Sequence, residues 1–98
     1  MNFNHCHDWT FVGLEIDWRL GESVFKMRDT SSHGRTLIAR GVLSVNLPRQ
    51  HPWGPSVSIN RMTQSQDERG CVLCIEMQSG DVIECIARSF DFAETSPD

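Results

Sequence analysis

The chain has 98 residues, which is the length of one domain and leaves no room for a second core. Its 39% hydrophobic and 22% charged residues are typical of a globular protein and argue against disorder. Thirteen acidic against nine basic residues leave a net charge of −4, which disfavours nucleic acid as a partner. The apolar runs are far shorter than the roughly 20 residues that span a bilayer, so we expect no membrane segment.

The first eight residues have neither a basic nor an apolar stretch, so they do not resemble a signal peptide. Without an export signal, the four cysteines are expected to be free thiols in a reducing cytoplasm. His5, Cys6, His7 and Asp8 are all of types that bind transition metals. Because this group is local and lacks a matching second half, the sequence favours a mobile polar terminus over a metal site.

The first predicted strand runs from Thr10 to Arg19, where apolar and polar residues alternate. The apolar residues expected to share its one face are Val12, Leu14, Ile16 and Trp18. A turn at residues 20–22 leads to a second strand, in which Phe25 and Met27 share a side. Residues 29–34 are predicted to form a polar loop from their turn chemistry.

A third extended stretch covers Arg35 to Leu47, with Gly41 marking a bulge or a bend in its middle. The residues expected on one side are Leu37, Ala39, Leu43, Val45 and Leu47. Residues 48–55 contain three prolines and cannot be regular. This segment carries His51 and Trp53, and a tryptophan on a stiff loop suits a binding surface. The alternative is that Trp53 folds back and plugs an open end of the sheet.

The rest of the chain continues the strand pattern. Residues 56–62 alternate again, residues 63–70 are predicted to be a polar loop, and Cys71–Ala87 is predicted to be a hairpin. Residues 89–93 extend it with Phe90 and Phe92, and no window keeps the spacing of an amphipathic helix. We therefore predict one all-β domain over residues 1–98, a small antiparallel barrel or sandwich of roughly six to eight strands.

The register of the Cys71–Ala87 hairpin decides which side chains face the core. A two-residue turn at Ser79–Gly80 would place Cys74 opposite Cys85 and mix apolar residues with glutamate on both faces. A three-residue turn closed by Gly80 in the left-handed conformation places Cys74 opposite Glu84 instead. Only the second register separates an apolar face from a partly charged one, so we predict that one. Its apolar face comprises Cys71, Leu73, Ile75, Met77, Ile83, Cys85 and Ala87.

This register argues against a functional cysteine pair. Cys71 and Cys74 have C-x-x-C spacing, but inside a strand the two thiols point to opposite faces. Cys74, Glu76 and Glu84 then lie together on the outer face, where a solvent-facing or interface-facing acidic patch is favoured over a catalytic cluster. No nucleophile motif or phosphate-binding glycine loop occurs, so we predict no catalytic residue, no metal site and no cofactor.

Three segments of the chain form a recognisable combination: His7-Asp8-Trp9, Pro52-Trp53-Gly54-Pro55-Ser56 and Glu76-Met77-Gln78-Ser79-Gly80-Asp81. Together they resemble small uncharacterised bacterial β-domain proteins. The resemblance covers most of the chain. It implies a bacterial cytoplasmic origin and a compact β fold, and it implies no activity.

The favoured function is a non-enzymatic protein-binding module that uses Trp53 and His51, the face with Glu76 and Glu84, or both. Its acidic surface would suit a basic protein partner, such as a nuclease-like toxin or a nucleic-acid enzyme. The alternative is a small-ligand or metal-binding β-domain, and a small enzyme is the least favoured class. Exposed edge strands are compatible with a homodimer, although no residue argues for one.

Overall fold

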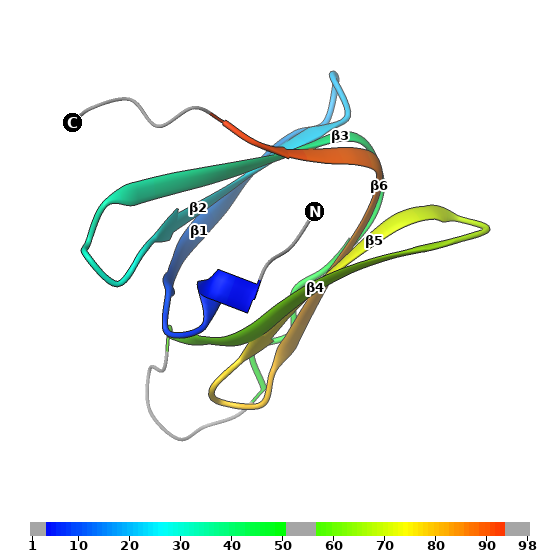
Figure 1. Ribbon diagram of the computed structural model, residues 1–98. Helices are drawn as coiled ribbons and strands as arrows, with labels where there is room; N and C mark the ends of the chain where they lie inside the picture. Colours follow the sequence, from blue (N-terminus) through cyan, green and yellow to red (C-terminus); the bar gives the residue numbers. More distant parts are fainter. Residues whose placement is uncertain (1–3, 51–56, 94–98) are drawn as a thin grey trace.

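The computed structural model describes residues 4–50 and 57–93, which form one sheet of six antiparallel strands (Figure 1). The strands are β1 (Thr10–Asp17), β2 (Glu22–Arg28), β3 (Gly34–Asn46), β4 (Ile59–Asp67), β5 (Gly70–Met77) and β6 (Val82–Phe92). A short 3-10 helix, η1 (Asn4–Cys6), precedes β1. No α-helix occurs within the two described ranges, and the prediction of an all-β fold is confirmed.

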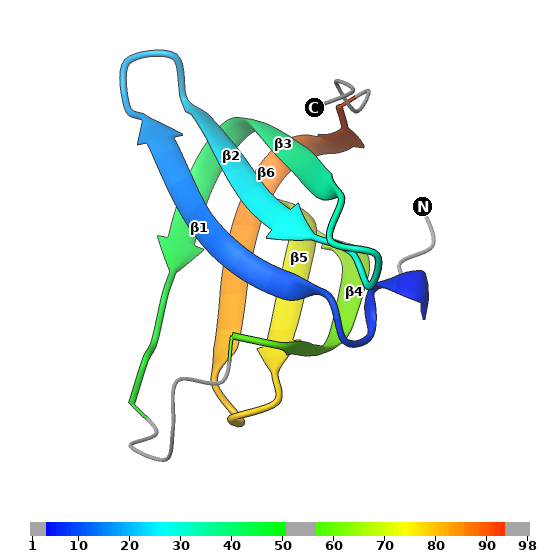
Figure 2. The ribbon, with the colours of Figure 1, turned by 90° about the vertical axis from the view of Figure 1, so that its left-hand side faces the viewer.

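The strand order is β1-β2-β3-β6-β5-β4, so two three-stranded meanders join where β3 pairs with β6. The sheet curls until its edge strands β1 and β4 meet near their first residues (Figure 1). There Thr10 bridges Ser58, and the Phe11 N–H donates a 2.7 Å hydrogen bond to the Val57 carbonyl. Beyond this point β1 and β4 run apart, which leaves the curled sheet unclosed (Figure 2).

The hydrophobic core fills the concave side of the curled sheet. Its buried strand residues are Phe25, Met27, Leu37, Ala39, Ile59, Met62, Leu73, Ile75, Met77, Ile83, Cys85, Ala87 and Phe90. Each large side chain of this kind stabilises the fold by about 1.5–3 kcal/mol relative to an exposed one. β1 supplies only the partly buried Phe11 and Leu14, so this edge of the sheet is the least covered.

The hairpin of β5 and β6 has the predicted register. Cys74 lies opposite Glu84, and the Met77 N–H donates to the Asp81 carbonyl at 2.8 Å. Gly80 has a φ of 103° and closes the turn by donating to the Met77 carbonyl, which confirms the three-residue loop. The outer face is less solvated than predicted, because Val72 and Ile86 are 5% and 3% exposed. These two residues pair with each other in the middle of four strands, where their neighbours shield them.

The prediction of a polar loop over residues 63–70 is wrong. β4 continues to Asp67, and the turn to β5 is confined to Glu68 and Arg69. The Asp67 carboxylate accepts hydrogen bonds from the backbone N–H and the guanidinium of Arg69, which tightens this turn. The prediction failed because β4 is an edge strand. Such a strand has a solvent-exposed face and forms backbone hydrogen bonds with a neighbour on one side only, so its residues can be polar.

A bulge overturns the predicted face of β1. The register shifts between Phe11 and Gly13, so Val12 is the extra residue and is 55% exposed. Phe11 and Leu14 pack against the core, whereas the prediction placed Val12, Leu14, Ile16 and Trp18 on that face. Trp18 lies beyond the end of β1 and is 91% exposed, so its predicted place on the buried face is wrong.

A second bulge changes the face of β3 after Gly41, as the glycine predicted. Gly41 has a φ of 66°, and the register with β6 shifts between Val42 and Ser44. Val42 and Val45 therefore pack against the core, whereas Leu43 is 59% exposed. Leu43 and Leu47 do not share the buried side with Leu37 and Ala39, which corrects the prediction for this half of the strand.

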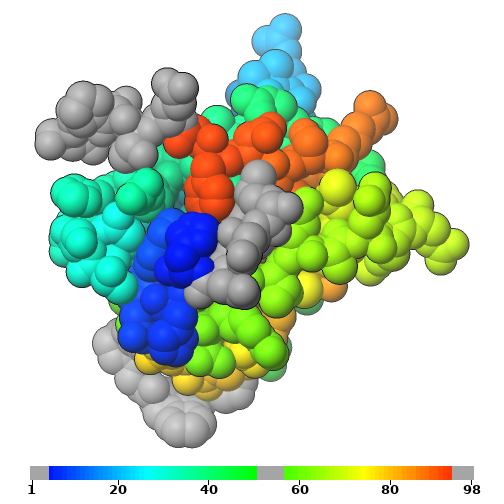
Figure 3. Space-filling view, viewed as in Figure 1, coloured from blue at the N-terminus to red at the C-terminus, as the bar shows by residue number. Residues whose placement is uncertain are grey.

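Residues 5–8 are packed against the sheet, so the prediction of a mobile polar terminus is wrong for them. Cys6 is fully buried, and the Asp8 N–H donates to the Ile59 carbonyl at 2.8 Å. His7 Nδ1 lies 2.7 Å from the Asn60 carbonyl, so β4 holds this segment through two successive residues. In the space-filling view the segment lies between β4 and the end of β6 (Figure 3).

Candidate functional site

The predicted binding residues fall into two groups. Trp53 and His51 lie outside the described residues. Glu76 of β5 and Glu84 of β6 share the outer face of the hairpin as diagonal neighbours. Glu76 is held by the Asn60 side-chain amide at 2.9 Å, and its Oε2 lies 3.6 Å from Arg61 Nη2. The acidic face is therefore partly neutralised at Glu76.

The four cysteines are free thiols. Cys71 and Cys74 point to opposite sides of β5, as predicted, and the Cys71 thiol donates to the Arg88 carbonyl at 3.4 Å. Desolvation, and then the negative charge of Glu84, raise the pKa of the Cys74 thiol. Burial raises the pKa of Cys85 to about 11, and it does the same for Cys6. These shifts keep the thiols protonated near neutral pH, which is the opposite of what a nucleophilic cysteine needs.

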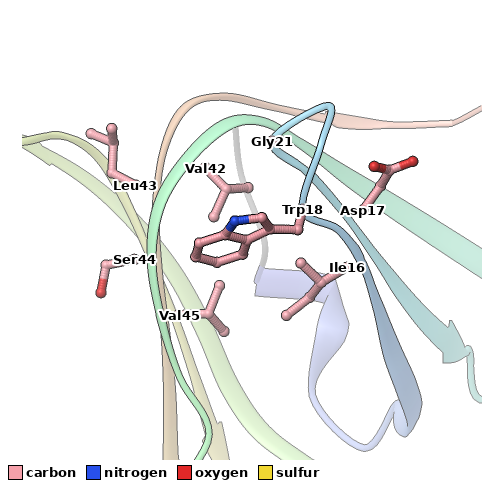
Figure 4. Close-up of a pocket in the computed structure, with 8 residues that line it drawn as sticks. All are labelled: Ile16, Asp17, Trp18, Gly21, Val42, Leu43, Ser44 and Val45. Carbon is pink, nitrogen blue, oxygen red and sulfur yellow. The ribbon is translucent and has the colours of Figure 1, made fainter.

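The most exposed aromatic side chain among the described residues is Trp18, in the turn between β1 and β2. It extends from this turn toward β3, over a hollow of about 390 Å³ that Ile16, Val42 and Val45 help to line (Figure 4). The side chains of Leu43 and Ser44 point away from the hollow. The hollow forms because β2 begins only at Glu22, so no strand lies between the end of β1 and the second half of β3.

Apolar residues surround this hollow without covering it. Ile16 and Leu43 are 47% and 59% exposed, and Leu20 at the hairpin tip is 66% exposed. A contiguous exposed apolar patch is uncommon on a monomeric protein and typically marks an interaction surface. Isolated exposed residues would need no explanation, but Ile16 and Trp18 both line this one hollow. We refer to Ile16, Trp18, Val42, Val45 and the hollow that they line as the Trp18 surface.

Carboxylates flank the Trp18 surface on the other side of β1. A groove of about 480 Å³ is lined by Glu15, Asp17, Trp18 and Glu22, among others. Glu15 is paired with Lys26 at 2.7 Å, and Asp17 accepts a hydrogen bond from the Leu20 N–H. The Glu22 carboxylate lies 4.0 Å from Arg40, which is closer to Asp91 at 3.0 Å. The carboxylates of Glu15, Asp17 and Glu22 thus face only Lys26 and an Arg40 that Asp91 shares, so these groups together carry a negative charge.

A smaller hollow of about 170 Å³ lies between the η1 segment, the start of β3 and the end of β6. The rings of His5, Trp9 and Phe92 approach one another with centroid distances of 5.2–6.2 Å. The Arg35 guanidinium lies 5.8 Å from the Trp9 ring and is bound by Asp29 at 2.9 Å. The paired Arg35 side chain therefore covers one face of the Trp9 ring beside this hollow.

The described residues contain neither a cluster of metal-binding side chains nor a membrane-spanning helix. In residues 4–50 and 57–93, no three His, Cys, Asp or Glu side chains converge so as to hold a metal ion. The same part of the chain has no helix that is long and apolar enough to cross a membrane.

Sequence reasoning missed the Trp18 surface because alternation assigned Trp18 to the buried side of a longer strand. The signal that could have found it is the adjacent Leu20-Gly21-Glu22 turn, which places Trp18 at a hairpin tip. Comparison with family models, curated proteins and solved structures found no match to this chain.

Proposed function

We propose that the chain is a non-enzymatic protein-binding module of a bacterial cytoplasm and that it contacts its partner through the Trp18 surface. The observation that carries the proposal is the 91% exposure of Trp18 beside the apolar hollow. Tryptophan is the residue type most enriched at binding hot spots, because a large rigid ring buries much area at low entropic cost. A partner side chain entering the hollow would cover Ile16 and Val45 together with the ring.

The carboxylates favour a basic partner. Glu15, Asp17 and Glu22 flank Trp18, and the whole chain carries a net charge of −4. Complementary charge steers association and selects the partner. A second copy of this chain would bring the same carboxylates together, and like charges across an interface oppose binding. A nuclease-like toxin or another nucleic-acid enzyme offers the basic surface that this rim would accept.

The acidic face of the hairpin is proposed as a secondary contact. Glu84 lies opposite Cys74 and extends the negative surface, whereas Glu76 is partly occupied by Asn60 and Arg61. Trp53 and His51 stay predictions for a contact from the proline-rich loop. The thiol chemistry gives no support to an enzyme, because the elevated pKa of Cys74 disfavours its thiolate.

Affinity capture from a bacterial cytosol tests this proposal, with tagged wild-type protein and Trp18→Ala as bait. Val57→Ala serves as the matched control, because Val57 is an apolar residue that is 48% exposed and does not line the hollow. We expect a stoichiometric basic protein that wild type and Val57→Ala retain and that Trp18→Ala loses. A hot-spot tryptophan costs about 2 kcal/mol or more on truncation, which is an affinity loss of about 30-fold. Equal recovery with Trp18→Ala would refute the assignment of the surface.

The small-ligand alternative has one supporting observation, the hollow beside His5, Trp9 and Phe92. Native mass spectrometry of protein purified without an affinity tag distinguishes this alternative from protein binding. A bound mass that survives desalting, and that Trp9→Leu removes while the fold is retained, would favour the ligand-binding function. Elemental analysis of the same sample tests the metal version.

A further inference from the structure

The second half of β3 has a pairing partner on one side only. β2 pairs with β3 from Gly34 to Arg40 and ends there, because β2 begins at Glu22. β6 continues along the other side of β3 as far as Asn46. On the open side, the described residues supply one backbone hydrogen bond, from the Val42 N–H to the Gly21 carbonyl at 2.8 Å. This open side borders the hollow of the Trp18 surface.

The register identifies which backbone groups are directed toward the open side. Hydrogen-bonded pairs alternate along an antiparallel ladder, and the Met77–Asp81 bond sets that alternation in the hairpin. The backbone N–H and C=O of Cys85 are therefore directed toward β5, whereas those of Glu84 and Ile86 are directed toward β3. Ser44 and Asn46 use their backbone groups on β6, so the N–H and C=O of Val45 are directed outward.

We propose that an extended, basic segment of the partner adds as a strand to this open edge, between Val42 and Asn46. This inference rests on the proposed function and specifies how the partner binds. An added strand satisfies the outward N–H and C=O of Val45 and places alternate side chains on the two faces of the sheet. One set enters the hollow against Ile16 and beneath Trp18. The other set lies on the outer side, next to Ser44 and Asn46 and toward Glu84.

Charge selects a basic segment over other occupants. Glu84 pairs with Asn46 on the outer face of the sheet, one strand in from the open edge, where Arg69 also interacts with it electrostatically. Long lysine or arginine side chains at the outward positions of the added strand can reach Glu84 across β3. A second copy of this chain would instead bring the carboxylates of its own β1 and β2, Glu15, Asp17 and Glu22, and these do not complement Glu84. The occupant is thus an alternating apolar and basic strand.

The experiment uses three synthetic hexapeptides and the full chain. The first alternates valine and arginine, the second alternates valine and glutamate, and the third is the first with N-methyl groups on alternate residues. The ¹⁵N–¹H spectrum of the protein locates binding, and calorimetry measures affinity. We expect the valine–arginine peptide to shift the Val42–Asn46 amides and the Trp18 indole. The glutamate peptide and the N-methylated peptide should each bind at least about 10-fold more weakly.

The variants separate this inference from the proposed function. Glu84→Gln should weaken the arginine peptide a few-fold and leave its binding position unchanged, whereas Val57→Ala should change neither. Equal binding of the N-methylated peptide would overturn strand addition. If Trp18→Ala also abolished that binding, the Trp18 surface would still be a docking site and the proposed function would survive. No shift at residues 42–46 with any peptide, or concentration-dependent dimerisation of the free chain through them, would overturn the inference.

Discussion

Replacing Gly41 with alanine tests the bulge that aims Val42 and Val45 into the hollow. Gly41 has a φ of 66°, a left-handed conformation that L-residues adopt at a cost. A Cβ atom added there would lie 2.7 Å from Cγ and Cδ of Arg88 and 3.0 Å from its Cβ. Contacts this short require the Arg88 side chain to move. Gly41→Ala should therefore lower the free energy of unfolding through two separable effects.

The magnitude follows from these two effects. The left-handed backbone costs about 1–2 kcal/mol for a residue with a Cβ. Forcing Arg88 into a displaced or off-rotamer position costs about 0.5–1.5 kcal/mol more. The reduced freedom of alanine in the unfolded chain offsets about 0.4–1 kcal/mol of this loss. The net destabilisation should be about 0.5–3 kcal/mol, a measurable fraction of a total stability of about 5–15 kcal/mol.

Urea unfolding followed by circular dichroism measures this change. Gly13→Ala is the matched control, because Gly13 lies in a strand, lacks a positive φ and has no atom within 4 Å of the added Cβ. We expect that control to stay within about 0.5 kcal/mol of wild type. Combining Gly41→Ala with Arg88→Ala should recover the steric part and keep the backbone part. The reasoning is refuted if Gly41→Ala matches Gly13→Ala, or if the second substitution recovers nothing.

Three further predictions concern the thiols, a loop carboxylate and the core. Because burial raises the pKa of Cys85 and Cys6 to about 11, both should react with iodoacetamide at neutral pH far more slowly than Cys71 in folded protein. Peptide mass spectrometry measures the order of labelling, and fast labelling of Cys85 would contradict the prediction.

Partial burial alone would raise the pKa of Asp29, but hydrogen bonds from the His33 N–H, Arg35 and the Ser31 N–H outweigh it and lower the pKa. A lowered folded-state pKa stabilises the fold above the unfolded-state pKa, and this stabilisation disappears as the pH falls through the folded-state value. Wild type should therefore lose more stability than Asp29→Asn between about pH 6 and about pH 3, and parallel stability curves in urea would count against this. Leu73→Ala should cost about 2–5 kcal/mol because Leu73 is fully buried, whereas Leu20→Ala should cost less than about 0.5 kcal/mol. A similar loss of thermal stability in both variants would show that the core is misassigned.

The strongest sequence predictions were those in which a local rule and the hydrophobic pattern agreed. Residues 78–80 specified a three-residue turn, and only that turn sorted Leu73, Ile75 and Cys85 onto one face. Phe25 and Met27 were assigned correctly for the same reason, because the extra residue in the β1–β2 pairing, Val12, lies on β1 and leaves the alternation of β2 intact. Gly41 signalled an irregularity, but it did not reveal which later residues would change sides.

Where prediction failed, the deciding contacts lay far away in the sequence. His5-Cys6-His7-Asp8 is polar, yet β4 orders it through the carbonyls of Ile59 and Asn60. The polar residues after Met62 form a strand because β5 supplies a ladder for them. Backbone groups that lack a partner in their own segment take whichever one the fold supplies, and a local pattern does not contain that information.

By itself, the sequence determined that this protein is all-β, that its last hairpin has one register and that Cys71 and Cys74 face opposite ways. Those outcomes depend on the two-residue period of a strand and on the conformational freedom of one glycine. Only the tertiary structure decided that Trp18 stands exposed beside a hollow, because that depends on how far β2 reaches along β3 and on two bulges. The residue at which the pairing between β2 and β3 ends cannot be read from the alternation of apolar and polar residues in the sequence. The candidate site therefore became visible only when the strands were placed side by side.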